Sequence, residues 1–415
     1  MAKRILGKTE TRRDPSVIPR SLSDELLRLI WRERCISRAE IARQTGLARS
    51  TVSEIVGGLL ETGLVAEAGT GKSRGGRRPI LLEFQDNACQ ILGVDIGAAH
   101  VAVALTDLRG RVFTWHESQH PVRTDPEGTR ELVKKLCTES LASIDGKKRL
   151  IGIGVAMPSP VDPLHSELLS ERVMPEWQGT SGLENLKKKF NVNVLIDNDA
   201  NLGALAERWW GAGRNTDNFI YIKVATGIGA GLILGGEIYR GSTGVAGEIG
   251  HIPVDPEGKL CVCGLKGCLV TFAGAYALED RARELLSSDH SDSILAGKDP
   301  NITAIEDAAL AGDRLALQLV EEATGNLGIV VAGLLNLMNP GMIVIGGSLA
   351  RLGDLILEPL RRTCNQLTLS DSAAAALLQT SDLGPQTEAI GASTLVLKTA
   401  LENPSEYFGV YAPEE

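Results

Sequence analysis

The spacing of apolar residues near the start of the chain predicts a helix. Leu22, Leu26, Leu29 and Ile30 recur at intervals of three or four residues, which places their side chains on one face of an α-helix. Residues 1–20 lack such a pattern and carry five Lys or Arg residues before position 14. We therefore expect a flexible basic arm at 1–20 and a folded domain from residue 21.

Residues 37–65 (SRAEIARQTGLARSTVSEIVGGLLETGLV) contain two further helical patterns separated by a turn at Gly46 and Leu47. This arrangement is typical of a helix-turn-helix, whose second helix enters the major groove of DNA. A helical hairpin used only for packing is the alternative. The first helix is expected around Ile41 and Ala42, and the second is expected to bury Val52, Ile55 and Leu59 while Arg49, Ser50, Ser53 and Glu54 point outward.

Two strand-like segments, 64–68 and 80–84, follow the second helix and flank GTGKSRGGRRP. We expect them to form the wing of a winged helix-turn-helix domain over 21–84. The narrow minor groove attracts arginine side chains on such a wing, although a solvated basic loop would have the same composition. The residues predicted to contact DNA are Arg38, Arg49, Ser50, Thr51, Ser53, Lys72, Arg74, Arg77 and Arg78.

The charge distribution agrees with this prediction. Residues 1–80 contain 16 Lys or Arg and 9 Asp or Glu, whereas the remaining 335 residues contain 27 basic and 43 acidic residues. A basic head on an acidic body indicates nucleic-acid contact confined to the head. No apolar segment follows the basic N-terminus as in a signal peptide, so we expect a cytoplasmic protein without a membrane partner.

The body, residues 91–400, begins with a strand, a turn and a strand at 91–112, and this layout recurs at 219–241. The repeat predicts a duplicated α/β fold with lobes at about 91–212 and 218–400 and a ligand cleft between them. Taken alone, the glycines near Thr226 are also compatible with a simple tight turn. The apolar run at 327–345 contains Asn336, Asn339 and Pro340, which favours a core helix followed by a buried strand over a membrane span.

Residues 247–268 (GEIGHIPVDPEGKLCVCGLKGC) contain one histidine and three cysteines within a short loop. Imidazole nitrogen and thiolate sulfur are the ligands that tetrahedral Zn²⁺ prefers, and four protein ligands leave no open position for catalysis. The sequence therefore predicts a structural zinc site. Its expected ligands are His251, Cys261, Cys263 and Cys268.

Three motifs give the chain a resemblance to the ROK family of repressors and sugar kinases, which share an actin-like, ribonuclease H-like duplicated fold. They are DNDAN at 197–201, GEIGH at 247–251 and CVCGLKGC at 261–268. The resemblance implies that Asn198, Asp199, Glu248 and His251 bind sugar hydroxyls. In a kinase of this family, Asp199 would be the general base, and the turn after Asp95 would hold nucleotide phosphates.

The chain departs from the family pattern at three positions. Ala98 and Ala99 replace a glycine and a phosphate-binding threonine, and Val270 stands where a second sugar-binding glutamate is usual. We therefore expect a non-enzymatic repressor of carbohydrate genes that binds operator DNA as a homodimer or higher oligomer and responds to a sugar or sugar derivative. The alternatives are a sugar kinase with an accessory DNA-binding domain and a regulator controlled by a partner protein.

Overall fold

The computed structural model describes residues 20–71, 78–144, 148–287, 292–369 and 376–409. The chain forms two compact units, and each is described separately. The first comprises residues 1–88 together with 398–415, and the second comprises residues 89–397. The predicted basic arm lies outside the described residues except for Arg20, which begins the first helix.

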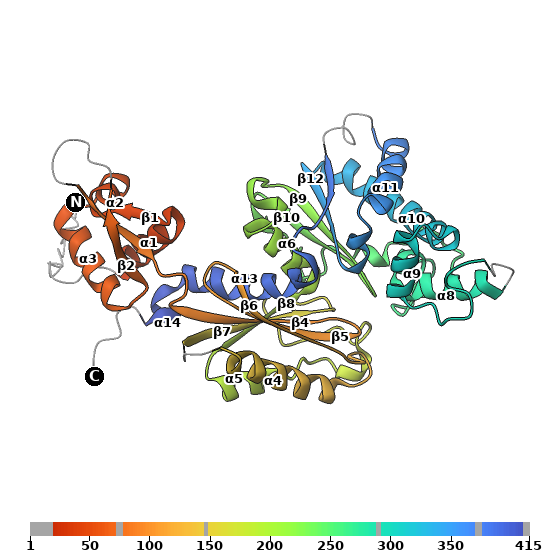
Figure 1. The fold of residues 1–415 in the computed structure, drawn as a ribbon, viewed down its shortest axis with the longest axis horizontal. Helices are drawn as coiled ribbons and strands as arrows, with labels where there is room; N and C mark the ends of the chain where they lie inside the picture. The colour runs from red at the N-terminus through yellow and green to blue at the C-terminus, as the bar shows by residue number, and fades with distance from the viewer. Residues whose placement is uncertain (1–19, 72–77, 145–147, 288–291, 370–375, 410–415) are drawn as a thin grey trace, which may run out of the picture. The chain divides into compact units, whose positions relative to one another are not determined.

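The first unit contains a winged helix-turn-helix domain, as the sequence predicts (Figure 1). Strands β2 and β3 form the expected antiparallel wing, and β3 also pairs with a short strand, β1, that sequence reasoning missed. Leu26, Ile41, Ile55 and Leu59 are fully buried, so the predicted apolar faces meet in one core. The elements are α1 (Arg20–Glu33), β1 (Cys35–Ser37), α2 (Arg38–Thr45), α3 (Arg49–Glu61), β2 (Val65–Thr70) and β3 (Ile80–Phe84).

The C-terminal segment belongs to the same compact unit as the head, which sequence reasoning did not predict. Helix α14 (Pro404–Phe408) follows the long helix α13 (Thr387–Glu402). Ser405 Oγ donates to Asp24 Oδ1 of α1 at 3.2 Å, and Arg28 Nη1 donates to the carbonyl oxygen of Glu402 at 3.4 Å. Helix α14 and the end of α13 therefore pack against the first helix of the DNA-binding domain.

The second unit contains two five-stranded sheets with the same topology. The first has the order β6-β5-β4-β7-β8 and the second has the order β11-β10-β9-β12-β13. In each sheet, three consecutive antiparallel strands are extended by two parallel strands. The strands are β4 (Cys89–Ile96), β5 (His100–Thr106), β6 (Val112–Gln119), β7 (Arg149–Met157), β8 (Asn193–Asn198), β9 (Phe219–Val224), β10 (Ile228–Leu234), β11 (Glu237–Ile238), β12 (Met342–Gly346) and β13 (Leu377–Thr380). The predicted duplicated α/β body is confirmed.

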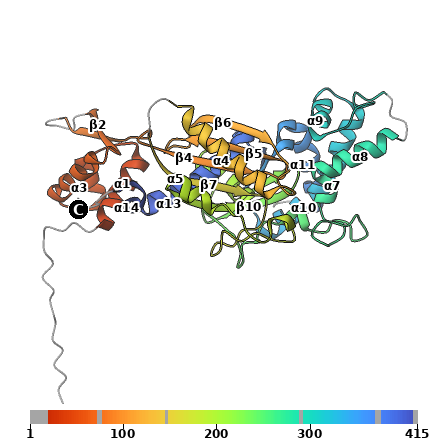
Figure 2. The same cartoon turned by 90° about the horizontal axis from the view of Figure 1, so that it is seen from below.

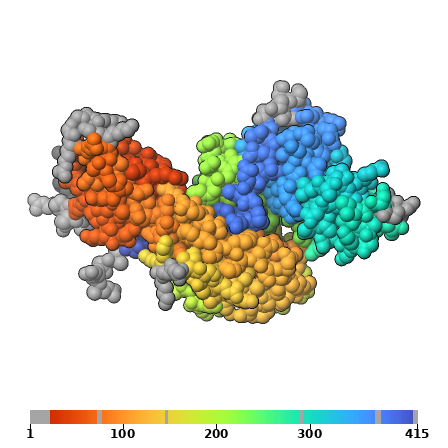
Figure 3. All heavy atoms as spheres, viewed as in Figure 1, coloured from red at the N-terminus to blue at the C-terminus, as the bar shows by residue number. Residues whose placement is uncertain are grey.

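Helices cover both faces of the first sheet. Helices α4 (Pro126–Ala142) and α5 (Glu184–Phe190) lie on one face, as Figure 2 shows. Helix α13 approaches the other face closely. A Cβ added to Gly93 would lie 1.9 Å from the Ala389 carbonyl oxygen, and a Cβ added to Gly154 would lie 1.8 Å from the Ala392 carbonyl oxygen. In Figure 3 the blue atoms of this helix border the orange and yellow atoms of the first lobe.

The second sheet lies between α6 (Asp199–Trp209) and a group of helices on its other face. This group comprises α7 (Val270–Ala273), α8 (Ala275–Ser287), α9 (Ile302–Leu310), α10 (Arg314–Met338) and α11 (Asp354–Leu367). Among the described helices, only α10 is long and apolar enough to cross a membrane, and 61% of its most apolar window is buried in the protein. It is the core helix predicted from the apolar run, and β12 is the buried strand expected after it.

Candidate functional site

The helix-turn-helix geometry is set by residues at the helix ends. Ser37 Oγ accepts a hydrogen bond from the Glu40 N–H at 3.2 Å and so caps the start of α2. Gly46 ends α2 with a left-handed φ of 71°, a conformation that glycine adopts without strain. The turn then leads directly into α3.

Arg49, Ser50 and Ser53 are exposed on the first turns of α3, and Thr51 is half-buried. Ser53 Oγ donates to the Arg49 carbonyl oxygen at 2.9 Å. Arg38 lies at the start of α2, where its Nη2 pairs with Glu67 Oε1 of β2 at 3.0 Å. Arg78 is exposed at the base of the wing, whereas the predicted DNA contacts Lys72, Arg74 and Arg77 lie outside the described residues.

In the body, the end of β8 and the start of α6 place Asn198 and Asp199 side by side. Asn198 caps α6, because its Oδ1 accepts from the Asn201 N–H at 3.1 Å, and its Nδ2 donates to the Ser159 carbonyl oxygen at 3.2 Å. Asp199 Oδ1 accepts from the Ala200 N–H at 2.8 Å. Its other oxygen, Oδ2, accepts from Lys223 Nζ at 2.9 Å.

The GEIGH motif is pressed against β10. An added Cβ on Gly247 would lie 1.9 Å from the Ala230 carbonyl oxygen, and one on Gly250 would lie 2.3 Å from that of Ile228, so both positions need glycine. Between them, Glu248 is mostly buried. Its burial, together with the nearby charge of Asp199, raises the pKa of this carboxyl to about 7.

The structure brings His251, Cys261, Cys263 and Cys268 together, and their ligand atoms all lie within 4.8 Å of one another. His251 Nδ1 is 3.5 Å from Cys261 Sγ, and Cys263 Sγ is 3.6 Å from Cys268 Sγ. In a tetrahedral site with Zn–S distances of about 2.3 Å, neighbouring ligand atoms are about 3.5–3.8 Å apart. The four donors are therefore compatible with a closed zinc site, and two of their pairs have its tetrahedral spacing.

Sequence reasoning missed a buried cluster of charged side chains in the second unit. Lys223 Nζ lies 2.9 Å from Asp199 Oδ2, 3.7 Å from Glu388 Oε1 and 4.0 Å from Asp95 Oδ1. His100 Nε2 contacts Asp95 Oδ2 at 3.0 Å. The available signal was a lysine within the apolar strand FIYIKV.

The charges of this cluster shift its pKa values in opposite directions. Burial opposes ionisation of Asp95, but Lys223 and His100 outweigh it and lower its pKa below the ordinary value. Burial also disfavours the charged form of His100, but Asp95 outweighs that effect and raises its pKa. Glu388 has a raised pKa because its burial dominates over the attraction of Lys223.

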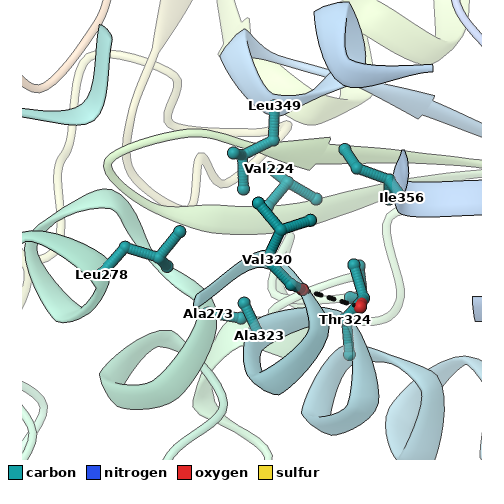
Figure 4. A pocket seen from close by; sticks show the side chains of 9 residues that line it. Val224, Ala273, Leu278, Val320, Ala323, Thr324, Leu349 and Ile356 are labelled. Carbon is teal, nitrogen blue, oxygen red and sulfur yellow. Dashed lines mark hydrogen bonds between the residues drawn. The ribbon is translucent and has the colours of Figure 1, made fainter. Parts of the chain in front are cut away.

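A separate pocket lies among the helices of the second lobe and is apolar (Figure 4). Its one polar side chain is Thr324, whose hydroxyl donates to the Val320 carbonyl oxygen at 2.7 Å, as the dashed line shows. The lining residues are Val224, Ala273, Leu278, Val320, Ala323, Thr324, Leu327, Leu349 and Ile356. Because this pocket offers no free polar group, it does not suit a polyol.

A helix-turn-helix head and a duplicated kinase-like body with a Cys₃His loop define a class of DNA-binding regulators built on a sugar-kinase scaffold. Residues 26–69 match the IclR helix-turn-helix domain, and residues 91–399 match the ROK family. The chain belongs to the ROK family.

Two relatives named as regulators are similar to almost the whole chain. The xylose repressor of Caldicellulosiruptor bescii is 32% identical over 383 residues, which cover 91% of this chain and 96% of the relative. The DNA-binding transcriptional dual regulator NagC of Escherichia coli is 34% identical over 386 residues, covering 91% and 93% respectively.

Solved structures include both a regulator and a kinase. A ROK family transcriptional regulator, described as a homologue of the E. coli MLC protein, has a TM-score of 0.76 at 26% identity, covering 94% of this chain and 96% of its own. A ROK family glucokinase from Streptomyces griseus, in complex with glucose and AMPPNP, has a TM-score of 0.66 at 27% identity, covering 74% and 98%. The kinase thus matches the body, and the regulator matches nearly the whole chain.

Proposed function

We propose that the protein is a transcriptional repressor of carbohydrate genes whose operator binding is controlled by a sugar or sugar derivative. The observation that carries the proposal is the joining, in one chain, of a helix-turn-helix with an exposed Arg49 face to a ROK body that retains Asn198, Asp199, Glu248 and His251. Repressor names among relatives that match over the full length favour the same function.

The effector site lies around Asn198, Asp199, Glu248 and His251. Carboxylate and amide groups can bind the adjacent hydroxyls of a polyol by accepting and donating hydrogen bonds. His251 turns Nδ1 towards the cysteines, which leaves Nε2 for a hydroxyl of the effector. Val270 packs against the hydrophobic core of the second lobe, so it supplies no acceptor, and the effector needs no partner at that position.

Zinc is the ion that we assign to His251, Cys261, Cys263 and Cys268. When bound, it supplies a structural crosslink with no open coordination position. The backbone next to the zinc ligands positions Glu248, because Gly247 and Gly250 hold the segment that carries it against β10. Loss of the ion would loosen both the loop and the effector site.

The proposal also covers the domain bounds, the oligomeric state and the location of the protein. We assign the arm to 1–20, the DNA-binding domain to 21–84 and the body to 91–400, with lobes at about 91–212 and 218–400. The protein works in the cytoplasm as a homodimer or higher oligomer, since helix-turn-helix dimers read two half-sites of an operator. The effector acts by binding one arrangement of the protein more tightly than the other.

The predicted DNA-contacting residues of the head divide into two roles. Arg49, Ser50, Thr51 and Ser53 at the start of α3 read base edges. Arg38, Lys72, Arg74, Arg77 and Arg78 contact phosphates or the minor groove. Because Arg38 is paired with Glu67, it must exchange this partner for DNA.

The test is operator release by sugars. An operator is first selected from random DNA with the purified protein, and its fluorescence anisotropy is then measured with glucose, xylose, N-acetylated sugars and their phosphates. We expect one class of these sugars to release the operator from the wild type but not from the Glu248→Gln variant. If no sugar releases DNA or shifts the melting temperature while a partner protein co-purifies, the effector is a protein.

A sugar kinase with an accessory DNA-binding domain is the second candidate. The glucokinase similarity and the presence of Asp199 favour it. Ala98, Ala99 and Val270 oppose it, and so does the ion pair that engages Asp199. Formation of a sugar phosphate from Mg-ATP by the wild type, but not by Asp199→Asn, would establish the kinase function.

A further inference from the structure

The turn between β4 and β5 is filled by the chain's own side chains. His100 lies over Gly97, because a Cβ added to that glycine would be 2.2 Å from His100 Cε1. The corresponding turn of the second lobe is open, since nothing lies within 4 Å of a Cβ added to Gly227. The His100 side chain therefore fills the space through which a phosphate would approach the backbone of Gly97.

Lys223 lies directly beside this turn, and its side chain is buried. Its ammonium group faces Asp199 at 2.9 Å, Glu388 at 3.7 Å and Asp95 at 4.0 Å. These carboxylates come from three separate segments of the chain, and Asp95 Oδ1 has no hydrogen-bond partner among the described residues. Three carboxylates converging on one point would also suit a hard divalent cation such as Mg²⁺ or Mn²⁺.

The residues present therefore do not fit a metal-bound nucleotide, although the related glucokinase structure contains a nucleotide analogue. We propose that the Lys223 ammonium is a tethered replacement for the divalent cation, and that His100 covers the glycine at which a phosphate would lie. The cleft then binds its effector without metal or nucleotide. This inference adds to the proposed function a specificity-determining residue, Lys223.

The same contacts affect Asp199. One of its oxygens accepts from the Ala200 N–H and the other from Lys223 Nζ. Proton abstraction from a sugar hydroxyl would have to use a carboxylate lone pair that neither the Ala200 N–H nor the ammonium engages. These two contacts hold the Asp199 carboxyl group in one orientation, in which a remaining lone pair can accept a hydrogen bond from an effector.

The inference predicts that removal of the ammonium creates a divalent-cation site. Mn²⁺ is titrated into the zinc-loaded full chain, and bound Mn²⁺ is measured by electron paramagnetic resonance. The wild type and the exposed-lysine control Lys188→Ala should bind no Mn²⁺ at this site at millimolar concentration. Lys223→Ala should bind one Mn²⁺ per chain and gain melting temperature from it, and adding Asp95→Asn should abolish both effects.

Because Lys223→Ala leaves three buried carboxylates without a cation, Lys223→Ala/Glu388→Gln serves as a second variant with less repulsion. Gain of Mn²⁺ binding by either folded variant supports the inference. Mn²⁺ binding by the wild type that Asp95→Asn removes, or a failure of both folded variants to gain it, overturns it.

Sugar-dependent release of operator DNA is measured on the same preparations. A wild type that binds Mn²⁺ and still responds to sugar contradicts only the role given to Lys223. A wild type that excludes Mn²⁺ and responds to no sugar contradicts only the proposed function.

Discussion

The proposed effector site has two sides that differ in their residues: a hydroxyl side around Asn198 and Glu248, and a phosphate side around Gly97. On the hydroxyl side, the chain has the proposed sugar-binding residues Asn198 and Glu248, and His251, which belongs to the Cys₃His cluster. On the phosphate side, His100 lies over Gly97 and Lys223 pairs with Asp199, which we propose excludes a metal-bound nucleotide. Together, the two proposals describe a kinase fold that keeps a sugar receptor while internal side chains replace its second substrate.

Loss of the Cys₃His metal site should have the largest effect on stability and should also abolish the sugar response on the hydroxyl side. Cys261→Ser removes one of four donors, so stoichiometric zinc should be lost, with destabilisation of roughly several kcal/mol and no sugar response. Zinc is measured by atomic absorption and unfolding by calorimetry. The control is Cys35→Ser, whose thiol is exposed in the head. A wild type that contains no stoichiometric zinc would contradict the assignment.

Substitution of the partly buried Glu248 carboxyl should have the second largest effect, on sugar affinity. Glu248→Gln keeps the size of the side chain but replaces one acceptor oxygen by an amide donor, so sugar affinity should fall by about 1–3 kcal/mol while operator binding in the absence of sugar is unchanged. Isothermal titration measures the affinity. Glu257→Gln, on the exposed part of the same loop, should behave like the wild type, and equal losses in the two variants would exclude a direct role for Glu248.

Substitutions in the head should change DNA binding and leave sugar affinity and zinc content unaffected. Arg49→Ala should lose about 1–3 kcal/mol of discrimination at one base position, because a bidentate base contact disappears. Arg78→Ala should instead weaken all sequences alike and lower the salt slope by about one. Binding to an operator library at several salt concentrations distinguishes them, and two variants with unchanged DNA binding would show that this face does not read DNA.

The smallest effect should be a pH dependence on the phosphate side. His100 faces Asp95, Lys223 and Glu117, and its folded pKa is raised above the ordinary 6.5. Its stabilising contribution is therefore complete below pH 6.5 and is lost as pH rises through the folded pKa. His100→Gln should lower the melting temperature at pH 6 more than at pH 9. An equal decrease at both pH values would mean that the imidazolium–carboxylate pair is not stabilising.

Much of this organisation could be predicted because its signals are local. The helix-turn-helix depends on apolar spacing within residues 37–65, and the two lobes depend on repeated strand–turn–strand segments. The Cys₃His cluster comes from one short loop. Local patterns are what sequence reasoning detects well.

The missed features depend on contacts between distant segments. Lys223 meets Asp95, Asp199 and Glu388, and Ser405 meets Asp24 across 381 positions of the chain. Ala98 and Ala99 indicated a damaged phosphate turn, but no sequence pattern showed that His100 fills it. Likewise, the short strand β1 forms because β3 offers it a partner.

Operator release without nucleotide tests the central claim most directly. The wild type, freed of nucleotide, is mixed with labelled operator and the releasing sugar, with and without Mg-ATP, while sugar phosphate is assayed in the same tube. We predict equal release in both mixtures and no sugar phosphate above that of a protein-free blank. Release that requires Mg-ATP, or a sugar phosphate whose formation is abolished by Asp199→Asn, would contradict the account.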